Sequence, residues 1–436
     1  MKIWSYTFGC KVNQYETELL RHRLTGPSDK AVNNLKEADL CLINTCSVTA
    51  FADKEARQMI RRVLRENSRA RTIVTGCYAT RAPKEVQAIS SRIELYTNAE
   101  KDELPSCVGY EVADKPLGIH QFAGRTRAFL KIQDGCKAPC NYCIIPTVRP
   151  TLWSKPVEHV MAEAQALLAN GYQELVLTGI RLGLYRGPVA ASSPNVLVGD
   201  PEKQGKDWIP AFAGMTKKQS KLDLVELLEK MVALPQKFRI RLSSLEVTEV
   251  TDRLLQFVAD NPKICRHFHI PMQSGDTEVL KSMQRWYDAD FYKSRITAVR
   301  SFLPDCGLTA DVMVGYPTES EQQFQNTFEL IRGMEMSGLH VFRFSGREGT
   351  KAAGLKPLDP QTIIRRAGAL GQLDKELRRQ YYDQFEGQMR EVLPEPSGEG
   401  WTDNYIRIEV PLADVSKGLH MAPVQSQNYS KELTHD

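Results

Sequence analysis

The stretch "FLKIQDGCKAPCNYCIIP", residues 129–146, places three cysteines directly after a short apolar run. The run predicts a buried strand, and the C-x3-C-x2-C spacing puts Cys136, Cys140 and Cys143 in one loop beyond the end of that strand. Three thiolates can hold an iron–sulfur cubane while one iron stays open to a small molecule. A structural zinc ion is the alternative, but no His or Cys within 144–158 provides its fourth ligand.

Strands and helices alternate from this point to about residue 345. Six apolar or β-branched runs, each followed by a helical pattern, predict a partial or complete β/α barrel over 125–357, with chemistry at the carboxyl ends of the strands. Residues 187–220 interrupt this alternation and are rich in Gly, Pro, Ser and Lys. A connection of this length is a functional lid or a tolerated insertion, and we favour the insertion. Its peptide "WIPAFAGMT" resembles the translated product of a mobile palindromic repeat found inside bacterial genes.

The segments on either side of the barrel predict two further domains. Residues 1–118 repeat a strand–helix pattern, which indicates a three-layer α/β domain with a parallel sheet between its helices. Residues 358–382 predict a connecting helix. Residues 383–436 contain runs that alternate with period two, so we expect a small domain made mainly of β-strands.

The N-terminal domain contains a second set of cysteines. Cys10, Cys46 and Cys77 each follow a predicted strand, although they are far apart in the sequence. Ligands collect at the carboxyl edge of parallel sheets, where these three thiols would converge. Unliganded thiols are the alternative, but three equivalent placements favour an iron–sulfur cluster. Cys41 lies inside its predicted strand and is expected in the core.

The composition limits the remaining possibilities. No apolar stretch approaches the roughly 20 residues that span a bilayer, and the N-terminus has no apolar signal region. We therefore expect a cytoplasmic protein without a membrane segment, whose ten cysteines are not paired as disulfides. The net charge of +4 permits RNA binding without requiring it.

The cysteine motifs resemble those of a known family. The loop at 129–146 resembles the cluster loop of radical S-adenosylmethionine (SAM) enzymes, and "GCKVNQYETE", "INTCSVTAFADKEARQ" and "TGCYA" extend the resemblance to the radical SAM methylthiotransferases. The "GCKVNQYET" form is most similar to the branch that modifies N6-threonylcarbamoyladenosine in tRNA. Other branches act on isopentenyladenosine in tRNA or on a ribosomal protein aspartate. The C-terminal tail resembles the TRAM domain, a small RNA-binding β-barrel.

This resemblance implies an enzyme with two 4Fe–4S clusters that uses two molecules of SAM. The cluster on Cys10, Cys46 and Cys77 would take up sulfide and a methyl group, and the other would cleave SAM to a radical that removes hydrogen from C2 of the adenine. The implied partners are a tRNA anticodon stem-loop and an electron donor such as a flavodoxin or ferredoxin, with the chain acting as a monomer. A non-catalytic iron–sulfur or zinc protein that binds RNA is the competing hypothesis.

The barrel would then hold SAM at the ends of its strands. Turn geometry or polar bonding in the core is the alternative for each candidate residue. Arg181 departs from the Asn or His expected there from the family. The candidates are Tyr142, Thr178, Gly179, Arg241, Ser243, Glu246, Gln273, Ser274, Asp311, Gly315 and Arg347.

A basic stripe is the candidate RNA contact. Arg57, Arg61 and Arg65 recur every four residues within one predicted helix, so they share a face that can meet phosphates. An ordinary solvated helix face is the alternative.

Overall fold

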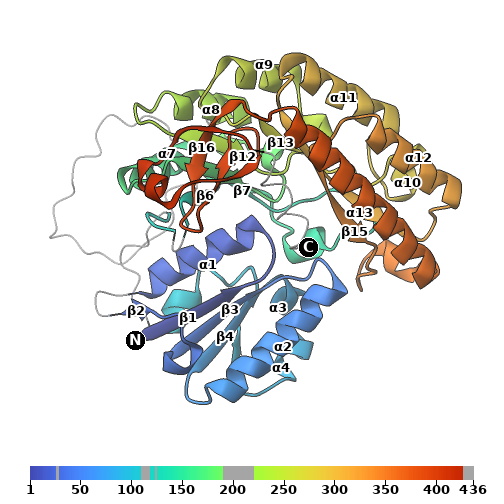
Figure 1. Ribbon diagram of the computed structural model, residues 1–436. Helices are drawn as coiled ribbons and strands as arrows, with labels where there is room; N and C mark the ends of the chain where they lie inside the picture. Colours follow the sequence, from blue (N-terminus) through green and yellow to red (C-terminus); the bar gives the residue numbers. More distant parts are fainter. Residues whose placement is uncertain (26–28, 110–117, 123–124, 190–219, 426–436) are drawn as a thin grey trace.

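The computed structural model describes residues 1–25, 29–109, 118–122, 125–189 and 220–425 (Figure 1). Residues 190–219, which form most of the expected insertion, and residues 426–436 of the expected C-terminal domain lie outside the described residues.

The N-terminal sheet is parallel throughout, with the strand order β2-β1-β3-β4-β5. Along β3, Leu40 and Leu42 pack with Leu20 of α1, whereas Ile43 packs with Ile60 of α2 on the opposite face, because successive side chains of a strand alternate. Helices thus cover both faces (Figure 1), which confirms the three-layer prediction. The elements are β1 (Lys2–Thr7), α1 (Lys11–Leu24), β2 (Lys30–Ala31), β3 (Leu40–Thr45), α2 (Ala50–Glu66), β4 (Arg71–Gly76), α3 (Cys77–Arg81), α4 (Pro83–Gln87), β5 (Ile93–Leu95) and α5 (Leu104–Cys107).

Six parallel strands form the predicted partial barrel. β6, β9 and β12 pair in one sheet, β13, β14 and β15 pair in another, and Ile240 of β12 bridges to Ile264 ahead of β13. Within the described part of the chain, β6 and β15 do not pair with each other, so the barrel is open between them. The strands are β6 (Arg127–Lys131), β9 (Glu174–Thr178), β12 (Arg239–Leu242), β13 (His267–His269), β14 (Gly307–Val314) and β15 (Gly338–Arg343).

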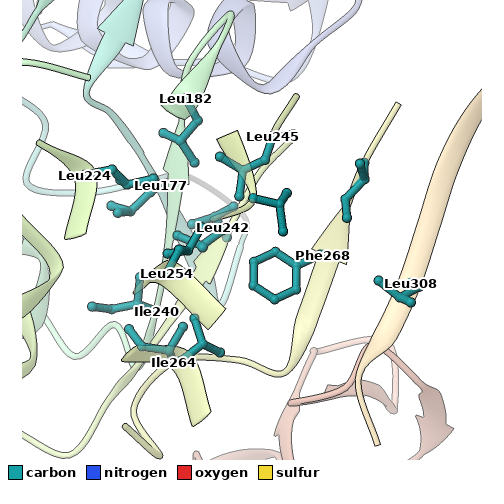
Figure 2. Packing of buried hydrophobic residues seen from close by; sticks show 14 of the residues in the cluster. Leu177, Leu182, Leu224, Ile240, Leu242, Leu245, Leu254, Ile264, Phe268 and Leu308 are labelled. Carbon is teal, nitrogen blue, oxygen red and sulfur yellow. The ribbon is translucent and has the colours of Figure 1, made fainter. Parts of the chain in front are cut away.

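The barrel and its helices share one large apolar core. Figure 2 shows Leu177, Ile240 and Leu242 from adjacent strands near Leu254 of α9 and Phe268 of β13. Fully buried strands of this kind give the continuous apolar runs seen in the sequence. The helices are α6 (Ile145–Val148), α7 (Val157–Ala169), α8 (Leu224–Val232), α9 (Asp252–Asp260), α10 (Thr277–Ser282), α11 (Ala289–Phe302) and α12 (Glu321–Arg332).

The C-terminal part is a long helix followed by a small antiparallel sheet, as the sequence predicts. Arg239 of the barrel donates to the backbone oxygens of Glu391 (2.9 Å) and Trp401 (2.6 Å), so the small sheet is docked on the barrel. The sheet has the order β18-β17-β16-β19, which is consistent with a TRAM-like domain. Its elements are α13 (Pro360–Asp383), β16 (Met389–Pro394), β17 (Glu399–Thr402), β18 (Arg407–Glu409) and β19 (His420–Pro423). No helix in the described part of the chain is long and apolar enough to cross a membrane.

A buried ion network joins the N-terminal domain to the barrel. Arg149, just after α6, donates to both carboxylate oxygens of Glu16 on α1 (2.7 and 2.8 Å) and to Asp134 (2.7 Å). Lys101 and Lys131 also pair with Glu16. Although burial opposes ionisation, the three cations hold the pKa of Glu16 well below its usual range. Glu16 therefore stays charged while buried.

The ends of the long interruption meet in a small antiparallel ladder. β10 (Gly187–Pro188) pairs with β11 (Lys221–Leu222), with Pro188 opposite Lys221. The chain before residue 190 and the chain after residue 219 therefore lie side by side, and the barrel does not need residues 190–219 to bridge a gap.

Replacing residues 190–219 with a short Gly/Ser linker should leave the melting temperature within about 3 °C of the wild type, because the ladder already closes the loop and closure entropy changes slowly with length. Differential scanning calorimetry of the full chain measures this. A larger deletion that also removes β10 and β11 is the control and should be less stable. A large loss from the first deletion would show that the segment stabilises the fold.

Glu16→Gln should destabilise the protein by about 3 kcal/mol near neutral pH, since three buried cations lose a charged partner. The pKa of Glu16 is depressed in the folded state, so its contribution is present above the unfolded pKa of about 4.3 and is lost as the pH falls below it. Urea unfolding between pH 7 and 3 should show the difference between wild type and variant shrinking below about pH 4. Glu278→Gln, which removes an exposed pair with Lys281, is the control and should change little. A difference that stays constant with pH would contradict this account.

Candidate functional site: two cysteine triads and the cavities beside them

The loop that bears Cys136, Cys140 and Cys143 is fixed at both ends. Gly135 has a φ of +77°, and a Cβ there would lie 2.0 Å from the backbone oxygen of Thr151, so only glycine fits before Cys136. Farther along, the backbone N–H of Asn141 donates to the oxygen of Met283 (3.2 Å). The loop is therefore held by the barrel.

All three cysteines line a cavity of about 260 Å³ at the carboxyl ends of the barrel strands. Four predicted SAM contacts line it as well: Tyr142, Glu246, Gln273 and Asp311. Arg181 also lines it, pairs with Glu249 (2.5 Å) and stacks on Trp286. This unexpected arginine thus belongs to the cavity wall.

Arg285 is a site residue that sequence reasoning missed. Its guanidinium donates to the Cys140 sulfur (3.2 Å) and pairs with Glu246. Burial raises the pKa of the Cys140 thiol, whereas Arg285 acts in the opposite direction and favours the thiolate. Arg285 follows a helix and not a strand, so no strand-end signal marked it.

The second triad lies at the edge of the N-terminal sheet. Cys10 caps α1, Cys46 follows β3 and Cys77 begins α3, after three adjacent strands. Gly9 has a φ of +81°, and a Cβ there would lie 2.7 Å from the Cys46 sulfur, so the loops of Cys10 and Cys46 touch. Burial, with a smaller contribution from the neighbouring Cys77 and Cys10, raises the pKa of Cys46 to about 12. The structure thus brings the three predicted ligands together.

The two triads are neighbours. Cys77 packs with Ile144 and Val148, and Ile144 directly follows Cys143 in the barrel loop. Arg149 spans the same junction, since it also donates to Asn13 (2.9 Å), which lies one turn after Cys10 on α1. A group bound at either triad therefore lies close to the other.

The donor sets fit iron–sulfur clusters better than single zinc ions. Sulfurs bound to one tetrahedral zinc lie about 3.8 Å apart, given Zn–S bonds of about 2.3 Å. Among the described residues, the only three potential ligand atoms that all lie within 4.8 Å of one another belong to His269, Asp311 and His340. The cysteine sulfurs are therefore spread more widely than zinc requires, and a larger cluster suits them.

The other predicted SAM contacts fall elsewhere. Arg241 and Ser243 line a second cavity, which Cys10 of the N-terminal domain also lines. Arg347 pairs with Asp53 of the N-terminal domain and donates to Ser47 (3.0 Å), so it links two domains. The remaining candidates, which are not among the described residues lining either cavity, are Thr178, Gly179, Ser274 and Gly315.

The basic stripe lies on α2 as expected, but its members differ. Arg57 donates to the Tyr78 hydroxyl (3.0 Å) and is half-buried, whereas Arg61 and Arg65 are exposed. Arg61 forms no ion pair with a described residue, whereas Arg65 lies 3.7 Å from the carboxylate of Glu66.

Two family models match successive parts of this chain. Residues 2–97 match the model described as uncharacterized protein family UPF0004, and residues 130–331 match the radical SAM superfamily. The chain is 35% identical to the threonylcarbamoyladenosine tRNA methylthiotransferase MtaB of Bacillus subtilis, over 92% of this chain and 89% of that protein. It is 32% identical to the MtaB of Thermotoga maritima, over 89% and 85% of the two chains.

More distant relatives include the tRNA-2-methylthio-N(6)-dimethylallyladenosine synthase of Helicobacter hepaticus, which is 29% identical over 92% of this chain and 86% of that protein. The solved structure of the radical SAM methyltransferase TsrM from Kitasatospora setae, with cobalamin and a [4Fe-4S] cluster bound, shares the fold. It has a TM-score of 0.54 and 12% identity and covers 81% of this chain and 77% of that chain. Long matches at 30% identity or more, together with the radical SAM segment, show that this chain belongs to the radical SAM methylthiotransferases of the MtaB type, enzymes that use a 4Fe–4S cluster and SAM.

Proposed function

We propose that this enzyme attaches a methylthio group to C2 of N6-threonylcarbamoyladenosine next to the tRNA anticodon, with one 4Fe–4S cluster on each triad. The juxtaposition of the two triads carries the proposal, because Cys77 packs against the loop that bears Cys143. A second cluster beside the radical centre provides a place for the sulfur close to where hydrogen is removed. The names of the MtaB relatives support the choice of substrate.

The cavity beside Cys136, Cys140 and Cys143 would receive SAM. Bound there, the cluster and SAM supply the radical that makes an unreactive C–H bond available. Tyr142 covers one side of the cavity, while Glu246, Gln273 and Asp311 offer polar atoms to the amino and carboxylate groups. Glu246 is held in place by its pair with Arg285.

The protein also controls the protons of the cluster ligands. Burial raises the pKa of Cys46 and of Cys143 to about 12, so both thiols are neutral before iron binds. Cluster assembly then releases protons, because the thiolate is the ligand. The buried cations Arg149 and Arg285 lie beside the two triads and favour the resulting negative charge.

The tRNA would lie across α2 and the C-terminal sheet. Arg61 and Arg65 present exposed positive charge, and Arg57 adds a partly engaged one. The electron would come from a flavodoxin or ferredoxin, and we propose that the enzyme works as a monomer in the cytoplasm. Methylthiolation of dimethylallyladenosine tRNA is the alternative suggested by the lower-identity relatives.

Replacing Cys10, Cys46 and Cys77 with Ala should lower the iron content from about eight to about four atoms per chain. SAM should still be cleaved to 5′-deoxyadenosine under reduction, but no methylthio nucleoside should form, because the intact triad supplies only the radical. Anaerobic reconstitution, iron assay and mass spectrometry of tRNA nucleosides measure these outcomes. The matched variant without Cys136, Cys140 and Cys143 should cleave no SAM. Full methylthiolation by the first variant would disprove the two-cluster proposal.

Arg61→Glu with Arg65→Glu should weaken tRNA binding at least tenfold at low salt and reduce the slope of log affinity against log salt, because phosphate contacts release counterions. Filter binding between 50 and 200 mM salt measures both quantities. Lys293→Glu, an exposed charge reversal on α11 of the barrel, is the control. Unchanged affinity and slope would remove the stripe from the RNA interface.

A further inference from the structure

A second cavity, of about 490 Å³, lies between the N-terminal triad and the open side of the barrel. Cys10 lines it, together with Phe129 of β6 and Phe342 of β15, the two strands that end the barrel. Asp311 and Phe342 line this cavity and also the cavity beside Cys136, so the two spaces meet. A ligand here would lie next to both triads, and the size is typical of a small-molecule site.

Two cations in this cavity have no ionic partner. Lys11 and Arg125 form no ion pair with any described residue. Glu395, whose charge acts on Arg125, forms its ion pair with Arg127 (2.8 Å) instead. Both side chains reach solvent, and Arg127 brings a third positive charge to the same cavity. The accumulated positive charge would attract an anion into the cavity.

Asp311 is the one acid among the described residues that line the cavity, and two imidazoles already contact its carboxylate. Asp311 contacts the imidazoles of His269 (3.1 Å) and His340 (3.3 Å), one from each neighbouring strand. Its charge is therefore partly offset by hydrogen bonds from its own surroundings, and it is not placed in an ion pair with Lys11. The cavity remains positive overall.

The cavity also has polar atoms that lack a partner within the described chain. The Ser243 hydroxyl and Nδ1 of His267 are buried without a hydrogen bond to any described residue. Buried polar groups of this kind are normally paired, so a bound ligand or water must complete them. The exposed side chain of Phe342 supplies apolar surface in the same cavity, whereas the ring of Tyr405 is already stacked on His267 and Trp401. The lining therefore suits a heteroaromatic ligand with an acidic arm.

We propose that this cavity receives the modified adenosine and that Lys11 and Arg125 bind the carboxylate of its threonylcarbamoyl group, which makes them specificity-determining residues. This inference rests on the proposed function. A dimethylallyl group, by contrast, carries no charge and would offer neither cation an ionic partner. The charge of the cavity thus separates the two tRNA substrates named among the relatives.

The test compares two synthetic anticodon stem-loops, one with N6-threonylcarbamoyladenosine and one in which its carboxylate is converted to the uncharged carboxamide. The reconstituted full-length wild type should prefer the acid by at least about 30-fold in kcat/KM. In Lys11→Gln/Arg125→Gln, this ratio should fall to within about threefold, mainly through KM for the acid. Lys11→Arg should keep most of the preference, and Lys293→Gln, which removes a distant exposed lysine, should keep all of it.

The ratio is informative because both substrates depend on the same clusters. A merely structural defect lowers both rates and leaves the ratio unchanged, and iron content with SAM cleavage in the absence of RNA checks the clusters. Since Lys11 adjoins Cys10, Arg125→Gln alone serves if the double variant loses iron. A wild type that accepts acid and amide equally, or variants that keep the preference, would overturn this inference and leave the proposed function intact. If the wild type modified neither stem-loop, the proposed function itself would fail.

Discussion

The bidentate contact between Arg149 and Glu16 is the constraint on which the rest of the site depends. Arg149 lies just beyond the barrel's cysteine loop, and its backbone oxygen accepts from the N–H of Cys136 (3.2 Å). Glu16 lies on the helix that Cys10 caps. One guanidinium therefore fixes the register between two loops that carry cysteines of the two triads. Its planar fork suits this role better than a lysine would, because it holds two acids and an amide at once.

Because this contact is buried, its charged groups lose their hydration and need partners within the protein. A charged pair removed from water is stable only if it has further hydrogen-bond partners. Asp134 and Lys131 supply such partners around Arg149 and Glu16, although Nε of Arg149 has none among the described residues. A second clamp, between Arg347 and Asp53, joins the far side of the barrel to α2. The domains thus meet through several specific ion pairs, which resist sliding more than an apolar contact of equal area would.

The sequence predicted the features that depend on the hydrophobic pattern of short segments. The hydrophobic periodicity and the alternation of strands with helices predicted the parallel N-terminal sheet and the six barrel strands. The cysteines of both triads follow predicted strands, so the strand ends located them. The pattern could not show which side chains meet across domains. Arg285 approaches Cys140 from a segment distant in the sequence, and Arg347 turns to Asp53 although it follows a strand. Arg241 and Ser243 do lie near a strand end, but they line the second cavity and not the one beside Cys136.

The open side of the barrel explains why there is room for the second cavity. A closed barrel would fill its interior with side chains, whereas β6 and β15, which do not pair with each other among the described residues, leave space that Lys11 and Cys10 reach from the N-terminal domain. The interior therefore joins a polar space to the cavity that bears Cys136, with Asp311 and Phe342 at the junction. The proposed reaction, with a radical source, a sulfur carrier and a substrate adenine, would need such a junction. The open barrel and the domain docked against it provide one together, and neither provides it alone.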